Sequence, residues 1–501
     1  MSASEISRLL EQALAAHRRR DPVQVNAWVR QVLTLDPENA DALYLLGISA
    51  ASMNRPDLAV HLLRKAVACN PGHPYYHFNL GSCFSALGQN ERAEESLRAA
   101  LALKPDLAEA HINLGNLRMA QGDPAVAVAC YLHAVGLNPD LTIAHYNLGV
   151  IFQEHGDHVA ALERFREALR CDPDYAPAHM GVAASRLKTG EYHEGWQEYE
   201  WRFRLPTHAP RLCPVPRWEG LPPEGARLPE GLRLYVYTEQ GFGDALMFAR
   251  FAPLLRERGG RVLLECRPEL SRLFAASSLA DLVSARALDD GAPPPFDYDR
   301  HVPLMSLPGL LGITLETLPD SCPYLVAPPE RVQAWGERLG EKKGWRIGLC
   351  WSGNPSTAVN RDRACTVQDL LPLTLLPGIT FYSLQKGPPA AQLTRELCQR
   401  HDIVSLEAEL EDFAETAAVL RNLDLLISTD TAIVHLAGGL GVPVWTLLHT
   451  ACEWRWLENR ATSPWYPSMR LFRQAGAGDW QELVERVRRA LDDSLNLKNL
   501  L

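Results

Sequence analysis

The stretch KPDLAEAHINLGNLRMAQGDPAVAVACYLHAVGLNP (Lys104–Pro139) holds one complete unit of a pattern that recurs along the first part of the chain. Proline returns every thirty-four residues, at Pro37, Pro71, Pro105, Pro139 and Pro173. Gly47, Gly81, Gly115 and Gly149 share a second slot, and alanines share two more, Ala59, Ala93, Ala127 and Ala161, then Ala66, Ala100, Ala134 and Ala168. Small residues suit positions where two helices cross closely, and proline suits a helix end. The pattern predicts stacked helical hairpins.

A period of this length is typical of tetratricopeptide repeats, which this part of the sequence resembles. Complete repeats are expected over 40–73, 74–107, 108–141 and 142–175. Atypical capping repeats are expected from about residue 6, where Ala13 replaces the glycine, and up to about residue 205, where Ala183 and Gly195 replace the expected glycine and alanine. The prediction for residues 1–205 is an all-α superhelix, and its aromatic tail, Gly195–Arg204, is expected to join it to its neighbour.

Composition and charge argue against a nucleic-acid-binding, secreted or membrane-spanning protein. The 501 residues carry a formal net charge of −10, which argues against a nucleic-acid partner. Eleven cysteines are scattered without CxxC spacing, as in buried thiols of a reducing compartment. The N-terminal stretch lacks the apolar core of a signal peptide, and no stretch is long and apolar enough to span a bilayer. A cytoplasmic protein is therefore expected.

The remaining residues follow a different period. A proline-rich linker is expected over 206–230. Short apolar or β-branched runs then follow at 232–238, 261–266, 346–351, 379–384, 423–428 and 442–448, and helical stretches separate most of them, for example 245–258, 367–376 and 412–422. This alternation predicts parallel sheets with crossover helices. Two Rossmann-like domains are expected, over 231–328 and 329–478, with a helix in the closing segment 479–501.

A first motif, TEQGFGD (Thr238–Asp244), follows a predicted strand and opens a helix. Its glycines allow a ligand to approach the backbone, and Asp244 is a candidate acid or base. The alternative is that Asp244 only caps the helix. The dinucleotide pattern GxGxxG is absent, which weighs against a nicotinamide cofactor.

A second motif, DTAIVHL (Asp430–Leu436), again lies between a strand and a helix. Thr431 and His435 are four residues apart and share a helical face. Asp430 and Thr431 are candidates to bind a nucleotide diphosphate, and the alternative is a capping aspartate with a core histidine.

A third set of polar residues follows predicted strand ends, where open parallel sheets bind ligands. Its candidates are Asn354, Arg361, Arg363, Gln385 and Lys386. The three cations among them suit phosphate oxygens, although each alone could be a surface charge.

Two of these stretches resemble a known family. EQGFGDALMFARFAPLL (Glu239–Leu255) is similar to the opening of the bacterial heptosyltransferase-like glycosyltransferases, and DTAIVHLAGGLGVP (Asp430–Pro443) to their nucleotide-binding segment, with Ala432 where those enzymes more often have glycine. The resemblance implies a GT-B fold of two Rossmann-like domains, a nucleotide-sugar substrate, no other cofactor and no metal.

The resemblance also implies roles for single residues. Asp244 would be the general base on the acceptor, within an acceptor loop formed by Glu239, Gln240, Gly241 and Gly243. Asp430, Thr431, His435 and Lys386 would hold the donor nucleotide.

The repeats offer a further pattern, since Asn79, Asn113 and Asn147 occupy one slot two residues before each glycine. Stacked carboxamides can bond the backbone of an extended polypeptide. This resembles the asparagine ladder of the O-linked N-acetylglucosamine transferases, and bacterial flagellin glycosyltransferases share the two-part design. The alternative is a packing role for the asparagines.

The sequence thus predicts a metal-independent glycosyltransferase that moves a sugar to Ser or Thr of a polypeptide held by the repeats, with flagellin as one acceptor class that the resemblance suggests. Two alternatives stay open at this point. One is a non-catalytic scaffold with a degenerate GT-B half, and the other is a transferase for surface polysaccharide.

Overall fold

The computed structural model describes residues 3–208, 211, 213–221, 227–286, 294, 296–319, 322–355, 363–450 and 452–498. The chain divides into two compact units, Met1–Gly181 and Val182–Leu501. The division lies earlier than the boundary expected at residue 205, because the aromatic tail of the last repeat packs within the second unit. Trp196 is buried there and donates from Nε1 to the carbonyl of Ile313 at 3.1 Å.

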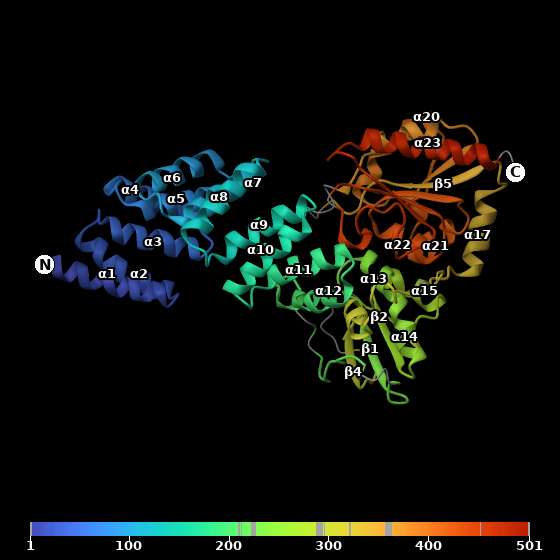
Figure 1. Ribbon diagram of the computed structural model, residues 1–501, viewed down its shortest axis with the longest axis horizontal. Helices are drawn as coiled ribbons and strands as arrows, with labels where there is room; N and C mark the ends of the chain where they lie inside the picture. The colour runs from blue at the N-terminus through green and yellow to red at the C-terminus, as the bar shows by residue number, and fades with distance from the viewer. Residues whose placement is uncertain are drawn as a thin grey trace. The chain divides into compact units, whose positions relative to one another are not determined.

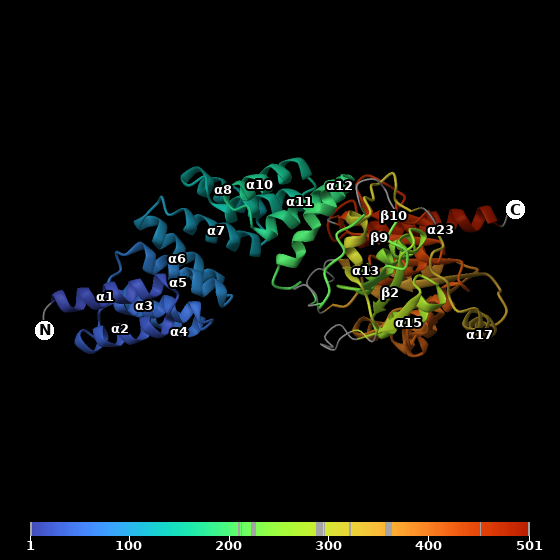
Figure 2. The same ribbon diagram turned by 90° about the horizontal axis from the view of Figure 1, so that it is seen from below.

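The first unit is built from antiparallel helix pairs, which Figures 1 and 2 show in chain order. The pairs are α1 (Ala3–Arg18) with α2 (Pro22–Leu35), α3 (Ala40–Ser52) with α4 (Pro56–Cys69), α5 (Pro74–Ala86) with α6 (Asn90–Leu103), α7 (Ala108–Ala120) with α8 (Pro124–Leu137), and α9 (Thr142–Glu154) with α10 (His158–Cys171). The next helix, α11 (Ala176–Thr189), crosses the division between the units. The predicted tetratricopeptide repeats are confirmed, including the atypical first one.

The glycine slot follows from how closely the two helices of a hairpin approach. A Cβ added to Gly115 would lie 2.5 Å from the Tyr131 ring, and one added to Gly149 would lie 2.6 Å from the Phe165 ring. Gly47 faces Leu63 in the same way at 2.8 Å. The large side chains recur with the same period as the glycines, so in each hairpin one bulky residue packs against one glycine.

The first sheet of the second unit is fully parallel, with strand order β3-β2-β1-β4. Its strands are β1 (Arg233–Tyr237), β2 (Arg261–Cys266), β3 (Leu282–Ala285) and β4 (Arg300–Pro303). The helix expected over 245–258 is split into α13 (Phe242–Phe248), the 3₁₀ turn η2 (Ala249–Phe251) and α14 (Ala252–Glu257), with Pro253 in the first turn of α14. The other helical elements are α15 (Pro268–Ala276), η3 (Leu304–Ser306) and α16 (Leu307–Leu310).

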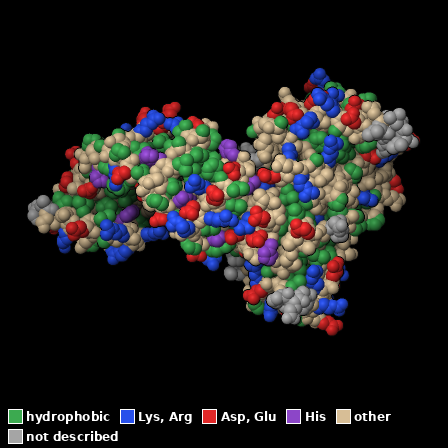
Figure 3. All heavy atoms as spheres, in the orientation of Figure 1, with side chains coloured by type: hydrophobic (Ala, Val, Ile, Leu, Met, Phe, Trp, Pro, Cys, Tyr) green, Lys and Arg blue, Asp and Glu red, His purple; other side chains and the backbone are tan. Residues whose placement is uncertain are grey.

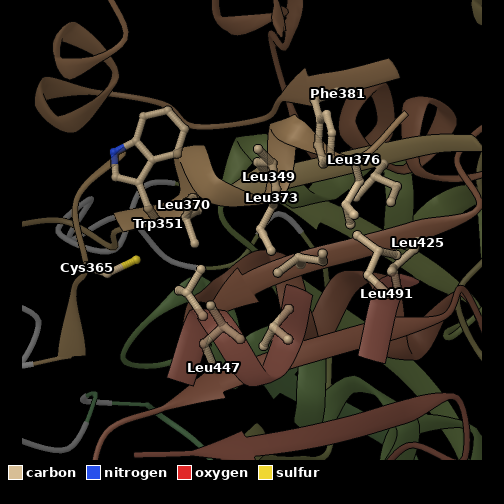
Figure 4. Packing of buried hydrophobic residues seen from close by; sticks show 14 of the residues in the cluster. Leu349, Trp351, Cys365, Leu370, Leu373, Leu376, Phe381, Leu425, Leu447 and Leu491 are labelled. Atoms are coloured by element: carbon tan, nitrogen blue, oxygen red, sulfur yellow. The ribbon is translucent and has the colours of Figure 1, made fainter. Parts of the chain in front are cut away.

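The second sheet is also parallel, with order β10-β9-β8-β5-β6-β7. Its strands are β5 (Trp345–Cys350), β6 (Ile379–Ser383), β7 (Ile403–Ser405), β8 (Leu425–Thr429), β9 (Val444–Leu448) and β10 (Met469–Arg473). Its helical elements are α17 (Pro329–Leu339), α19 (Val367–Leu370), η4 (Leu371–Leu375), η5 (Pro388–Gln392), α20 (Arg395–His401), η6 (Glu407–Glu409), α21 (Phe413–Leu420), α22 (Ala432–Gly439), η7 (Trp454–Trp456) and α23 (Trp480–Lys498). Figure 4 shows the core on one face, where Leu349, Phe381 and Leu425 from the sheet pack with Leu491 of α23.

Strand order reverses at one point in each sheet. In the first sheet the reversal lies between β1 and β4, and in the second it lies between β5 and β8. Ligands of open parallel sheets bind outside the carboxyl ends of the strands at such a point. The motifs ending in Asp244 and beginning at Asp430 directly follow β1 and β8, and so lie at these two positions.

The segment expected to be a linker, 206–230, is packed against the first sheet where the structure describes it. Arg217 forms a parallel bridge to His301 of β4, and the amide of Trp218 donates to the carbonyl of His301 at 2.8 Å. The guanidinium of Arg211 pairs with Glu265 at the end of β2. These residues extend the first sheet domain rather than separating it from the repeats.

On the face drawn in Figure 3, Lys and Arg side chains are interspersed with Asp and Glu. A helix with the length and apolar character of a membrane span is absent from the described residues.

Candidate functional site at the strand ends of the second unit

Asp244 lies in the first turn of α13, and its two carboxylate oxygens have different partners. Oδ2 accepts from the backbone amide of Gly241 at 3.0 Å, which is the capping contact considered above. Oδ1 accepts from the guanidinium of Arg455, which belongs to η7 beyond the second sheet. Asp244 therefore caps its helix and also forms an ion pair between elements of the two sheets.

The loop before Asp244 is held by the aromatic tail of the last repeat. The fully buried guanidinium of Arg202 bonds Glu239 at 2.9 Å and Ser306 Oγ at 2.7 Å. Gln240, which has a positive φ of 59°, donates from its side chain to Tyr199 Oη at 3.4 Å. The predicted acceptor loop is thus fixed by side chains from η1 (Glu200–Arg204) and α12 (Tyr192–Tyr199).

The second motif forms the turn from β8 into α22. Asp430 is buried, accepts from Trp456 Nε1 at 2.8 Å and faces Arg363 at 3.7 Å. Thr431 is the residue before α22, and its Oγ1 lies 3.2 Å from Ser428 Oγ. His435 stacks on the Trp456 ring with 5.3 Å between centroids, so Trp456 contacts both ends of the motif.

His435 is held in its neutral form. Burial, aided by the nearby Arg455 cation, lowers the pKa of His435 to about 4, although Asp430 acts in the opposite direction. Its Nδ1 lies 3.0 Å from Tyr466 Oη. His435 is therefore a buried, neutral imidazole that packs on Trp456 and has Tyr466 as a hydrogen-bond partner.

The two glycine-bearing motifs come into direct contact. A Cβ on Gly243 would lie 3.1 Å from His435 Cδ2 and 3.5 Å from the Cα of Ala432. A side chain at position 243 would press on His435, so the glycine favours the close approach of α13 to α22. The structure thus brings Asp244 and the Asp430–His435 motif, which are far apart in sequence, to one place.

The third set of candidates is distributed around this place. The Gln385 side chain is buried and bonds the backbone of the loop after β5, accepting from the amides of Trp351 at 3.0 Å and Ser352 at 2.9 Å. Lys386 donates to the carbonyl of Leu410, and Asn354 is exposed just after β5. In this conformation Gln385 shapes a loop, and Lys386 points to a backbone carbonyl. Arg361 lies outside the described residues.

Two charged residues of this place were not among the sequence candidates. Glu453 bonds both Arg363 and Arg455, and Arg455 in turn bonds Asp244. They follow β9, the next strand in the sheet, within the sequence GluTrpArgTrp (Glu453–Trp456). Nothing in the local sequence marks the two residues as a pair with Asp244 and Arg363, because their partners lie 211 and 90 positions away.

Among the described residues, no group of three or more His, Cys, Asp or Glu side chains could hold a metal ion.

The asparagine slot of the repeats forms side-chain hydrogen bonds between neighbouring hairpins. Asn79 Nδ2 donates to Tyr44 Oη at 3.2 Å, Asn113 Nδ2 to Ser82 Oγ at 2.8 Å, and Asn147 Nδ2 to Asn116 Oδ1 at 2.9 Å. Each donor therefore bonds the preceding repeat, and each side chain is half-buried. The asparagines do form a ladder, but its NH₂ groups link neighbouring repeats.

The Tetratricopeptide repeat family model matches residues 7–74, 44–108 and 112–176. Protein FlbA of Caulobacter vibrioides is 31% identical over 335 residues, which cover 61% of this chain and 53% of the relative. The chain thus spans about half the length of that relative.

Solved structures that align with the chain include three from bacteria. MamA 41-end from Desulfovibrio magneticus RS-1 is 20% identical, with a TM-score of 0.31, and covers 35% of this chain and 99% of its own. Pseudomonas aeruginosa pilF is 19% identical, with a TM-score of 0.37 and coverages of 41% and 92%. The Thermus thermophilus protein TTC0263, described as a thermophilic TPR protein, is 20% identical, with a TM-score of 0.33 and coverages of 36% and 99%.

Proposed function

We propose that this chain is a cytoplasmic, metal-independent protein glycosyltransferase of the GT-B type. The observation that carries the proposal is the meeting of Asp244 with the Asp430–His435 motif beyond the carboxyl ends of two parallel sheets. Sites at strand-order reversals of parallel sheets commonly bind nucleotides. The resemblance of both motifs to heptosyltransferase-like enzymes supplies the reaction class.

In the proposed reaction a Ser or Thr hydroxyl of a polypeptide attacks C1 of the donor sugar. The new C1–O bond forms as the bond from C1 to the phosphate oxygen breaks, and the nucleoside diphosphate leaves with the bonding electrons. Asp244 takes the hydroxyl proton, since a carboxylate retains lone pairs beyond the two used by Gly241 and Arg455. The Arg363 guanidinium offsets negative charge on the departing diphosphate.

The acceptor in this proposal is a polypeptide. Tetratricopeptide solenoids present extended binding surfaces, and the carboxamide oxygens of the asparagine ladder are acceptors suited to backbone amides. Flagellin is one acceptor class, suggested by the resemblance described in the sequence analysis.

A second candidate function is a scaffold without transferase activity. It is favoured by the ion pairs themselves, because Asp244, Glu453 and Asp430 each have partners within the chain. Paired charges of this kind also occur as purely structural networks.

Calorimetry with a panel of nucleoside diphosphates separates the two candidates. The transferase requires that the wild-type chain bind at least one of them. The Asp430→Asn variant keeps an oxygen for Trp456 Nε1 and should bind that nucleotide about 1–3 kcal/mol more weakly. A wild-type chain that binds none of the panel would support the scaffold.

A further inference from the structure

Five charged side chains form an alternating series at the candidate site, in the order Asp244, Arg455, Glu453, Arg363, Asp430. Adjacent members are joined by ion pairs, of which the longest joins Arg363 Nη1 to Asp430 Oδ2 at 3.7 Å. The two arginines thus share one carboxylate, that of Glu453, between them.

Glu453 is the most exposed member of the series. Its side chain is 32% exposed, whereas those of Arg363 and Arg455 are 14% and 8% exposed. Its Oε1 bonds Arg363 and its Oε2 bonds Arg455, so a single anionic group spans two guanidinium groups. Paired guanidinium groups match the oxygens of phosphate as well as those of carboxylate.

We propose that the Glu453 carboxylate is a built-in substitute for the donor's diphosphate, and that a diphosphate displaces it from the Arg363–Arg455 pair. This inference rests on the proposed function, because it assigns the diphosphate subsite and its regulation. Arg455 also holds Asp244, so a diphosphate that draws Arg455 toward itself releases one oxygen of the proposed base. Donor binding and release of the base are then linked through one guanidinium group.

Replacement of the Glu453 carboxylate by a diphosphate requires rotation of the Glu453 side chain and little backbone movement. The ammonium of Lys188, itself buried, donates to the carbonyls of Cys452 at 2.5 Å and Glu453 at 3.2 Å. At the other end of the turn, Arg473 donates to the carbonyl of Trp456 at 2.6 Å. The backbone that carries Glu453 is therefore held on both sides, and the half-buried carboxylate is the part that moves in the proposed exchange.

Isothermal titration of the full-length chain with inorganic pyrophosphate and with nucleoside diphosphates tests the inference. Glu453→Gln keeps the shape of the side chain but removes the charge that competes with a diphosphate. Affinity for pyrophosphate should rise on the order of tenfold, the scale of losing one charged competitor for the arginines. Glu453→Asp is one methylene shorter and cannot span both guanidinium groups. Its affinity for pyrophosphate should rise by a smaller factor, and it replaces Glu453→Gln in the test if that variant misfolds.

Glu330→Gln is the matched control, since Glu330 is exposed at the start of α17 and its loss changes the net charge by the same amount. It should bind pyrophosphate as the wild type does. In the double variant Arg455→Gln with Glu453→Gln, the affinity for pyrophosphate should no longer rise, because the rise depends on the Arg363–Arg455 pair.

Unchanged or weaker pyrophosphate binding by both Glu453 variants would overturn the inference. The proposed function would still stand in that case if the wild type binds a nucleoside diphosphate. Tighter pyrophosphate binding with no binding of any nucleoside diphosphate would support the anion subsite and count against the proposed function.

Discussion

Gly243 packs closely against His435, although 192 positions separate them in sequence, and a single added Cβ on Gly243 would lie 3.1 Å from His435 Cδ2. This contact fixes how closely the turn after β1 approaches the turn after β8. The spacing of Asp244 from Asp430 depends on it, since both residues lie in the turns that the contact joins.

Gly243→Ala should therefore push the two turns apart. Its backbone conformation tolerates alanine, so the cost comes from overpacking, about 1–3 kcal/mol of the free energy of unfolding. Chemical unfolding of the full chain measures it. Gly476→Ala is the control, because nothing lies within 4 Å of a Cβ there, and it should change stability by less than ~0.5 kcal/mol. Equal stability of the two variants would show that the contact is not tight.

The buried His435 predicts a pH dependence of stability. Its folded pKa of about 4 lies below its ordinary value of 6.5, so the unfolded chain binds this proton first as the pH falls. The stability that His435 contributes is complete above pH 6.5 and is lost as the pH falls toward 4, by an amount on the order of 1–3 kcal/mol. Unfolding curves of the wild type across this range check the sign.

The variants make this test specific. His435→Gln should flatten the pH dependence between 4 and 6.5, whereas His193→Gln, at an exposed position of α12, should leave it as in the wild type. The same slope in the wild type and in His435→Gln would mean that His435 is protonated equally in both states.

The asparagine ladder predicts separable effects on stability and on acceptor use. Replacing Asn79, Asn113 and Asn147 together by alanine removes three bonds between repeats, each contributing about 0.5–1.5 kcal/mol, so the melting temperature should fall. Modification of a polypeptide acceptor should be lost, while hydrolysis of the donor sugar nucleotide should persist because the proposed active site is in the second unit.

Ser82→Ala provides the control for this ladder. It removes the acceptor of the Asn113 bond but leaves the carboxamide in place. Stability should fall by about 0.5–1.5 kcal/mol with acceptor modification retained. If Ser82→Ala abolishes modification as fully as the triple variant, the asparagines act through packing alone.

The repeats could be predicted from sequence because their packing is local. Each glycine meets a bulky side chain sixteen residues later, as Gly115 meets Tyr131, so the period records the contacts directly. A second periodic signal was overlooked. His77, His111, His145 and His179 recur in one slot, and each ring nitrogen lies 2.8–3.0 Å from the carbonyl of the proline six residues earlier.

In the second unit, the long buried strands could be predicted from the sequence, whereas the short or polar strands could not. The strand β7 has three residues and β4 carries Arg300 and His301, so neither shows an apolar run, and only pairing with a longer neighbour makes them strands. The candidate site was incomplete for a related reason. Arg455 belongs to the candidate site because of its ion pair to Asp244, 211 positions away, and no local sequence pattern encodes such a contact.

The most direct test of the account is intact-protein mass spectrometry of a polypeptide acceptor co-expressed with the full-length chain, with Asp244→Asn as the comparison. Asparagine keeps an oxygen that can accept from the Gly241 amide but removes the proposed base, so modification should slow by about 10²–10⁴-fold. The wild type should add sugar-sized mass increments at Ser or Thr, and Asp244→Asn, although folded, should add almost none. Equal modification by both proteins would contradict the role of Asp244, and an acceptor left unmodified by the wild type across the candidates tried, flagellin included, would contradict the assignment as a protein glycosyltransferase.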